Sequence, residues 1–301
     1  MKKLKKLGTR FVSAVLVMLL LATLIPAGTI FVNAAENFYA KKLGGDSVTY
    51  YSSLENAWNS LADTGGTVGL LQDAETSTTL TVFQSKGYIL EMNGHRIDRG
   101  LVNEKVEQNN GTVIEVAKGG ELVVYGGTRS NPEPDNYLEY ECYKNDRYCE
   151  LVRHSTHAYH RGLITGGHSS YAGGGIAIEE SASVELNYVT VAGNRSGGYL
   201  NDDGGCGGGI ALRGDNARFK MYDSNVSYNF AERGGGVCVC NAKNSTVTLE
   251  RSYSSDAVCD ISANVGRESG GGVAICGDSG GTKIDGYGSR PKLINRISSN
   301  S

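Results

Sequence analysis

The sequence predicts an all-β protein that is built from stacked repeat units, a parallel β-helix. The first observation is a glycine triplet followed by a β-branched residue, which occurs four times. The second is an asparagine upstream of each of the last three triplets, at Asn194, Asn229 and Asn264. The third is composition: 42 glycines and 4 prolines among 301 residues suit many short strands joined by tight turns. The four units are Gly173–Ile176, Gly207–Ile210, Gly234–Val237 and Gly270–Val273.

Alignment of the units brings apolar residues into columns. Strands alternate faces with period 2, so residues two apart along a strand share one face, which we expect to be buried. The columns are Ile176, Ile210, Val237 and Val273; Ile178, Leu212, Val239 and Ile275; Val184, Phe219 and Val247; and Leu186, Met221 and Leu249. The residues between the first two columns (Ala177, Ala211, Cys238 and Ala274) are expected to face outward, so Ala211→Ser should be nearly neutral.

Stacking explains why such repeats occur. A single unit cannot bury its apolar face, whereas neighbours at a strand spacing of about 4.8 Å can do so for each other. Aligned asparagines can then hydrogen-bond to one another along the stack. A β-sandwich or barrel also has many short strands but does not need columns in register.

The first 34 residues are typical of a secretory signal peptide. Five basic residues between Lys2 and Arg10 precede an apolar run from Phe11 to Ile25, and small residues before Ala35 suit cleavage after Ala34. A membrane anchor is the alternative, although the apolar run is short for a span. No later stretch is long and apolar enough to cross a bilayer, so we expect a secreted, extracellular or cell-surface protein.

One amphipathic helix is predicted at Ser53–Ala62, where it would cap one end of the stack. Leu54, Ala57, Trp58 and Leu61 form one apolar stripe. Ser52 and Glu55 suit a capping box. No element is expected in the polar segment 35–51. Short strands are expected at Thr67–Leu71, Thr79–Phe83, Tyr88–Met92, Thr112–Val116 and Leu122–Tyr125.

Thr128–Arg161 breaks the pattern and predicts a long insertion without a clean strand. Long loops on a rigid scaffold often carry function. Its tyrosines can bind a ligand such as a sugar ring, or can pack the insertion onto the stack. Its histidines are metal-ligand types, but no carboxylate or thiolate stands at a known spacing, so no metal site is assigned. The candidate ligand-binding residues are Tyr137, Tyr140, Tyr143, Tyr148, His154, His157 and His160.

Charge excludes nucleic acid as a partner. The first 34 residues hold five of the 29 basic residues and no acidic one, which leaves 24 basic against 32 acidic residues. Phosphate binding needs clustered positive charge. Asp202 and Asp203 offer oxygens to a calcium ion, but two adjacent aspartates supply few of the six to eight ligands that calcium prefers.

Seven cysteines are present, an odd number, so at least one thiol stays free or pairs outside the chain. Cys240 and Cys276 fall in register on successive units. Their Cα atoms should lie about 4.8 Å apart, within the range that a disulfide accepts. Two stacked free thiols are the alternative.

Glu179 and Arg213 share one outward column and are the candidate pair for lyase or hydrolase chemistry. That column continues with Cys240 and Cys276, so it does not form a charged cleft. We recognise no catalytic motif in the chain.

The Gly-Gly-Gly-Ile and Gly-Gly-Gly-Val units with their preceding asparagines resemble the repeats of secreted bacterial surface proteins. These proteins have the right-handed parallel β-helix of the pectate-lyase-like fold and of polymorphic membrane proteins. The segment from Ser53 to His95 resembles their N-terminal part, where a short helix caps the first coil. The resemblance covers about Leu54 to Ile275 and implies fold rather than activity.

We therefore expect a non-catalytic, adhesin-like or glycan-contacting protein whose partner is an extracellular glycan or a host or cell-surface component. A polysaccharide lyase or glycoside hydrolase acting on acidic polysaccharide is the alternative. The polar tail after Ile275 contains no helix that could cap the stack. The chain is accordingly expected to belong to a longer protein or to pair through this end.

Overall fold

The computed structural model describes residues 37–102, 111–127, 137–142, 149–154, 161–197, 205–250, 259–287 and 296–298. Residues 36–301 form one compact unit. The expected signal peptide lies outside the described residues. Among those residues the chain is all-β apart from one short helix, as expected, and no helix is long and apolar enough to span a membrane.

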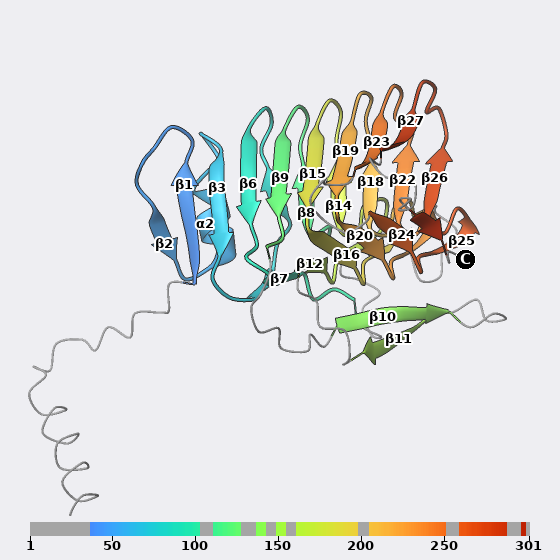
Figure 1. Cartoon of the computed structure of the whole chain (residues 1–301), viewed down its shortest axis with the longest axis horizontal. Coiled ribbons are helices and arrows are strands. Elements are labelled where there is room, and N and C mark those ends of the chain that lie inside the picture. Colours follow the sequence, from blue (N-terminus) through green and yellow to red (C-terminus); the bar gives the residue numbers. More distant parts are fainter. Residues whose placement is uncertain are drawn as a thin grey trace, which may run out of the picture. The chain divides into compact units, whose positions relative to one another are not determined.

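Most strands lie in parallel sheets that the chain visits in a repeating order (Figure 1). Sheet A contains β3 (Gly66–Leu70), β6 (Gly87–Glu91), β9 (Glu121–Tyr125), β15 (Ser183–Asn187), β19 (Arg218–Tyr222), β23 (Thr246–Glu250) and β27 (Lys283–Tyr287). Sheet B contains β4 (Ala74–Glu75), β7 (Arg96–Asp98), β12 (Gly162–Thr165), β16 (Val189–Ala192), β20 (Asn225–Ser227), β24 (Asp260–Ser262) and β28 (Arg296–Ser298).

Sheet C contains β5 (Leu80–Val82), β8 (Ile114–Val116), β14 (Ile176–Ile178), β18 (Ile210–Leu212), β22 (Val237–Cys240) and β26 (Val273–Cys276). The smaller sheet D contains β13 (His168–Ser169), β17 (Arg195–Ser196), β21 (Phe230–Arg233) and β25 (Val265–Ser269). From β12 onward each repeat unit passes through sheets B, D, C and A in that order before the chain returns to sheet B.

The predicted columns are confirmed by the strand register. Ile176 pairs with Ile210, Ile210 with Val237, and Val237 with Val273. The two columns of sheet A pair in the same way, and their residues are buried in one continuous core. The last unit departs from the pattern, since Ile275 is 51% exposed although it lies in register. Beyond it, β27 and β28 add strands that the sequence pattern did not predict.

The residues expected to be solvent-facing on sheet C are in fact buried. Ala177, Ala211 and Cys238 alternate with the core columns but are fully inaccessible, and Ala274 is nearly so. Ala172 and Cys206 pack over this outer side and form a second apolar cluster with it. The expectation that Ala211→Ser is neutral is therefore wrong, because the new hydroxyl would be buried.

The predicted asparagine ladder is confirmed. Asn229 Oδ1 accepts hydrogen bonds from the backbone N–H and the Nδ2 of Asn194, at 3.0 and 3.1 Å. Asn264 Oδ1 accepts the equivalent pair from Asn229, both at 3.0 Å. All three side chains are fully buried.

The glycine triplets fit against this ladder. The first glycine of each triplet has a positive φ, between 59° and 72°. A Cβ on the second glycine would overlap a sheet D carbonyl oxygen, as Gly208 would with Phe230. A Cβ on the third would lie within 3.0 Å of a ladder asparagine, as Gly209 would with Asn229. The triplet and the asparagine are thus two halves of one packing unit.

The N-terminal region contains the predicted helix and two strands that were not predicted. Helix α2 spans Leu54–Asn59, shorter than Ser53–Ala62, and its apolar stripe is buried. Its N-cap is Ser53, whose side chain accepts from the Asn56 N–H, so the capping box proposed from Ser52 is wrong. The carboxylate of Glu55 instead accepts from the Ser77 N–H. The unpredicted strands β1 (Phe38–Lys42) and β2 (Thr49–Tyr51) extend sheet A antiparallel.

The expectation that Thr128–Arg161 lacks a clean strand is also wrong. Strands β10 (Tyr137–Cys142) and β11 (Cys149–His154) pair antiparallel in a two-stranded sheet of their own. The chain leaves sheet A after β9, forms this hairpin and re-enters the parallel sheets at β12.

Candidate functional site

The outer face of sheet A is the candidate site, because its strand register assembles surface residues into rows. The central row begins at Lys41 on β1, which pairs with Thr67 on β3. It continues through Ile89 and Val123 on the next two strands. In the later repeat units the same row contains Glu185, Lys220, Thr248 and Asp285.

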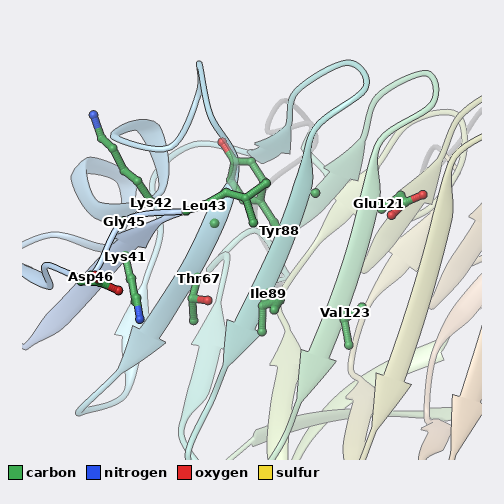
Figure 2. Close-up of a pocket in the computed structure, with 13 residues that line it drawn as sticks. Lys41, Lys42, Leu43, Gly45, Asp46, Thr67, Tyr88, Ile89, Glu121 and Val123 are labelled. Carbon is green, nitrogen blue, oxygen red and sulfur yellow. The ribbon is translucent and has the colours of Figure 1, made fainter.

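A groove of about 640 Å³ lies over the first strands of this face (Figure 2). Thr67, Ile89 and Val123 stand side by side on adjacent strands and form part of its lining. Ile89 is 39% exposed, which is high for an isoleucine in a sheet. Lys41 and Lys42 at the end of β1 and Leu43, Gly44, Gly45 and Asp46 in the turn after it add to the lining. The remaining lining residues are Gly66, Gly87, Tyr88 and Glu121, so the groove holds two acidic residues, Asp46 and Glu121, as well as the two lysines. Neither Lys41 nor Lys42 forms an ion pair with a residue that the structure describes, so both charges can meet a ligand.

A second row of the same face is rich in tyrosine. It contains Tyr50 and Tyr39 on the antiparallel strands and Tyr125 on β9. Tyr222 follows two strands after Tyr125, at about 9.6 Å along the sheet. Tyr125 is 48% exposed, so its ring offers a flat apolar surface beside the groove.

Tyr39 is held in place at the start of this row. Its ring occupies the space above Gly69, where any side chain would clash with it. Its hydroxyl donates to the Glu91 carboxylate, and the Tyr39 and Tyr50 rings meet edge to face at 6.4 Å. Burial and then the bond to Glu91 raise the pKa of Tyr39, so it stays a neutral phenol.

The later part of the face neutralises its own charges. Lys220 Nζ lies 3.0 Å from the Glu250 carboxylate and 4.6 Å from the Tyr222 ring centroid. Burial opposes the charged form, but contacts with Tyr222 and Glu250 outweigh it and raise the pKa of Lys220. The groove near β1, whose two lysines form no ion pair with a described residue, is therefore the part of this face that is best suited to an external ligand.

The residues predicted from the insertion are only partly placed. Tyr137 and His154 are cross-strand partners on the hairpin, and Tyr140 is paired with Leu151. Tyr143, Tyr148, His157 and His160 lie outside the described residues, as do Asp202 and Asp203.

The candidate acid and base are joined in a salt bridge. Arg213 Nε lies 2.7 Å from Glu179 Oε1, and Arg213 Nη2 also lies 3.7 Å from Glu115. The guanidinium is thus shared between two carboxylates on the outer side of sheet C. Such mutual neutralisation is typical of a structural ion network.

Cys240 and Cys276 are directly paired in register, as the sequence predicted. The structure adds two neighbours, since the Sγ atom of Cys238 lies 3.1 Å from Cys240 and 3.5 Å from Cys276. Cys206 Sγ lies within 4.8 Å of the Cys238 and Cys276 sulfurs. Hydrogen bonds with Cys206 and Cys238 lower the pKa of Cys240, whereas hydrogen bonds with Cys206, Cys240 and Cys276 raise the pKa of Cys238, so these thiols titrate as one interacting cluster.

The sheet A groove does not follow from the repeat pattern, because the aligned columns contain only inward-facing residues. Tyr125 and Tyr222 both end a strand whose inward residues are apolar, so the same alignment read at the outward positions would have found the tyrosine row. The groove itself depends on β1 and on the turn after it, which no repeat signal marks.

Comparison with protein-family models, with curated proteins and with solved structures finds no match to this chain. The function must therefore be argued from the residues themselves.

Proposed function

We propose that this protein is a right-handed parallel β-helix that works outside the cell as a non-catalytic, glycan-contacting surface protein. The recurring order of sheets and the paired columns support the β-helix. Parallel strands joined by a crossover within one sheet are almost always connected in the right-handed sense, which supports the handedness. The signal-like N-terminus supports export.

The observation that carries the glycan proposal is the groove on sheet A. Its lining combines apolar side chains at Ile89 and Val123 with two lysines and two acidic residues, Asp46 and Glu121. The exposed ring of Tyr125 lies outside this lining, two residues beyond Val123 on β9. Sugar rings present apolar C–H faces to aromatic and aliphatic side chains, while their hydroxyl and carboxylate groups need polar partners. Lys41 and Lys42 suit a glycan that contains uronic acids, because ammonium groups pair with carboxylates.

Binding to polysaccharides tests this proposal directly. Purified protein is run in affinity gels that contain polygalacturonate, alginate or a neutral glucan, and retardation measures binding. We expect retardation by an acidic polymer that weakens with salt. Lys41→Gln combined with Lys42→Gln should remove most of it, and Tyr125→Ala should weaken it independently of salt.

Two matched variants serve as controls. Lys118 is also exposed but pairs with Glu180 and does not line the groove, so Lys118→Gln should bind normally. Tyr171 is 61% exposed and lies between β13 and β14, so Tyr171→Ala should also bind normally. Equal losses in all four variants, or no retardation by any polymer, would contradict the glycan proposal.

Incubation of the protein with the same polysaccharides in solution distinguishes binding from catalysis. Release of unsaturated uronates or new reducing ends would indicate a lyase or a hydrolase. If Glu179→Gln or Arg213→Lys then abolished that release, the ion network on sheet C would be catalytic and our proposal would be wrong. We expect no product.

A further inference from the structure

We propose that Cys206, Cys238, Cys240 and Cys276 form a structural zinc site on the outer side of sheet C. The four thiols come from three successive repeat units. Cys206 immediately precedes the glycine triplet at Gly207, Cys238 and Cys240 lie on β22, and Cys276 ends β26. One ion here would tie these three units together.

Three of the four sulfurs lie close enough together for a tetrahedral thiolate site, and the fourth, on Cys240, contacts Cys238. Zinc binds cysteine sulfur at about 2.3 Å, which places the sulfurs of a tetrahedron about 3.8 Å apart. The measured separations are 3.1 Å for Cys238 to Cys240 and 3.5 Å for Cys238 to Cys276. Cys206, Cys238 and Cys276 all lie within 4.8 Å of one another. Cys240 is not part of that trio, so its side chain must rotate for all four sulfurs to reach one ion.

The strand geometry explains how the thiols converge. Cys238 and Cys240 are two residues apart on β22 and therefore share its outer side, while Val237 and Val239 point into the core. Cys276 is the in-register neighbour of Cys240 on the next strand. Cys206 reaches the group from the segment that packs over sheet C, where it forms an isolated bridge with Arg233.

The surroundings suit a closed structural site. Cys206, Cys238 and Cys240 are buried among small residues, Ala172, Ala211 and Ala274. Zinc with four thiolates carries two net negative charges, which are costly to bury without a nearby cation. The backbone of Arg233 bridges that of Cys206, and the Arg233 guanidinium, which pairs with Glu268 at 2.9 Å, is the cation beside the cluster. A guanidinium next to the sulfurs is a suitable outer partner for such a site.

Disulfides are the competing use of these thiols. Cys238 and Cys240 are separated by two strand residues, about 6.6 Å, which is near the upper limit for a disulfide. The four thiols would then pair as Cys240–Cys276 with Cys206–Cys238, or as Cys238–Cys276 with Cys206–Cys240. Either pairing would split the four cysteines into two separate disulfides, whereas one zinc ion would bind all four thiolates.

Metal analysis of the purified protein tests the site. The protein is isolated with a thiol reductant, dialysed against zinc and then against metal-free buffer, and its zinc content is measured by mass spectrometry. We expect one zinc per chain. Cobalt(II) in place of zinc should give the near-ultraviolet charge-transfer bands of thiolate ligands and the visible bands of a tetrahedral ion.

Variants locate the ion. Cys238→Ser and Cys276→Ser should each lose the bound zinc and the cobalt bands. Cys259→Ser is the matched control, because Cys259 is fully buried but bonds to the backbone oxygens of Met221 and Glu250. It should keep one zinc per chain. The cobalt titration of the unaltered protein needs no variant, so it decides the question even if a serine variant fails to fold.

Two results would overturn the proposal. The first is a peptide map of protein isolated without reductant that shows disulfides among these four cysteines, together with no zinc uptake after reduction. The second is a number of titratable thiols in the reduced protein that does not fall when zinc is added, where the site predicts a fall of four.

Discussion

The buried amides of Asn194, Asn229 and Asn264 show how one residue type links successive repeat units. Each side chain must satisfy two N–H donors and one acceptor in the absence of water, and a neighbouring asparagine in register does so. Asn229 also donates to the carbonyl oxygens of Val191 and Ser227, at 2.9 and 3.0 Å. A ladder of this kind fixes the bend of the backbone between sheets B and D.

Replacement of Asn229 by alanine should therefore destabilise the protein strongly. It removes the acceptor of Asn194 and leaves buried polar groups unpaired, each at about 1–3 kcal/mol. We expect a loss of about 2–5 kcal/mol in the free energy of unfolding, measured by urea denaturation. Asn187→Ala, at a half-buried position on sheet A, should cost much less. Similar losses at the two positions would mean that the ladder contributes little.

His168 makes stability depend on pH. Burial and the nearby Arg195 lower its pKa, although its ring nitrogen lies 3.1 Å from the carbonyl oxygen of Gly197. The unfolded histidine titrates near pH 6.5 and binds a proton more readily than the folded one. Stability should therefore fall as pH drops below about 6.5 and level off below the lower pKa of the folded state.

The variant His168→Gln isolates this contribution. The difference in thermal midpoint between wild type and variant should shrink as pH falls from 7.5 to 5. Most of this change should occur within about one or two pH units of the normal histidine pKa. Burial raises the pKa of Glu232 on β21, so its contribution has the opposite sign and is common to both proteins. Parallel curves for the two proteins would show that His168 does not titrate differently on folding.

At the scale of the elements, the triplets must be glycine because neighbouring backbone atoms pack closely against them, and not only because they form turns. A Cβ at Gly208 would overlap the carbonyl oxygens of Phe230 and Gly235, two backbone groups that cannot move aside. Gly280, by contrast, has nothing within 4 Å of an added Cβ and no positive φ. The two glycines form a matched pair within one chain.

We expect Gly208→Ala to lower the thermal midpoint sharply or to prevent folding. Gly280→Ala should be neutral or stabilising by about 0.4–1 kcal/mol, because alanine restricts the unfolded chain. Differential scanning calorimetry of the two variants checks this contrast. Tolerance of alanine at Gly208 would show that sheet D can separate from the triplet.

The β10–β11 hairpin places Cys142 directly opposite Cys149. Residues paired across antiparallel strands have Cα atoms about 4.5–5.5 Å apart, within the disulfide range. If the protein is exported, we expect these two cysteines to form a disulfide that closes the turn. Peptide mapping without reductant should recover them linked. With the four clustered thiols, this pairing leaves Cys259 as the odd cysteine.

Strands that recur in every repeat unit are easier to predict from the sequence than strands that occur once. The columns through Val237 and Val239 are predictable because every repeat unit presents the same face to its neighbours. Strand β1 is not predictable in this way, since it is antiparallel and occurs once. The burial of Ala211 was missed because the covering residues lie outside its strand: Ala172 comes from the preceding unit and Cys206 from the segment just before the triplet at Gly207. Alternation gives the side of a strand but does not reveal what packs against that side.

In the whole molecule, each repeat unit contacts mainly its neighbours. The free energy of unfolding is therefore close to a sum of terms for the single units and for the interfaces between adjacent units. The N-terminal units have helix α2 packed against the core through Leu54 and Trp58. The later units end in exposed apolar residues, of which Ile275 and Ile284 are examples. The zinc site lies among these later units. A zinc ion there would cross-link three neighbouring repeat units and so offset the smaller burial of apolar side chains in them.

Removal of zinc should therefore affect the two ends differently. Hydrogen exchange is followed by mass spectrometry in the reduced protein, with zinc and after chelation. We expect exchange to accelerate in β18, β22, β26 and the adjoining strands of the later units, since local opening there would no longer break metal bonds. Strands β3, β6 and β9 should keep their protection because the coupling between repeat units weakens with distance along the stack. A uniform acceleration would indicate a single cooperative unit, and unchanged exchange everywhere would mean that the four thiols hold no stabilising ion.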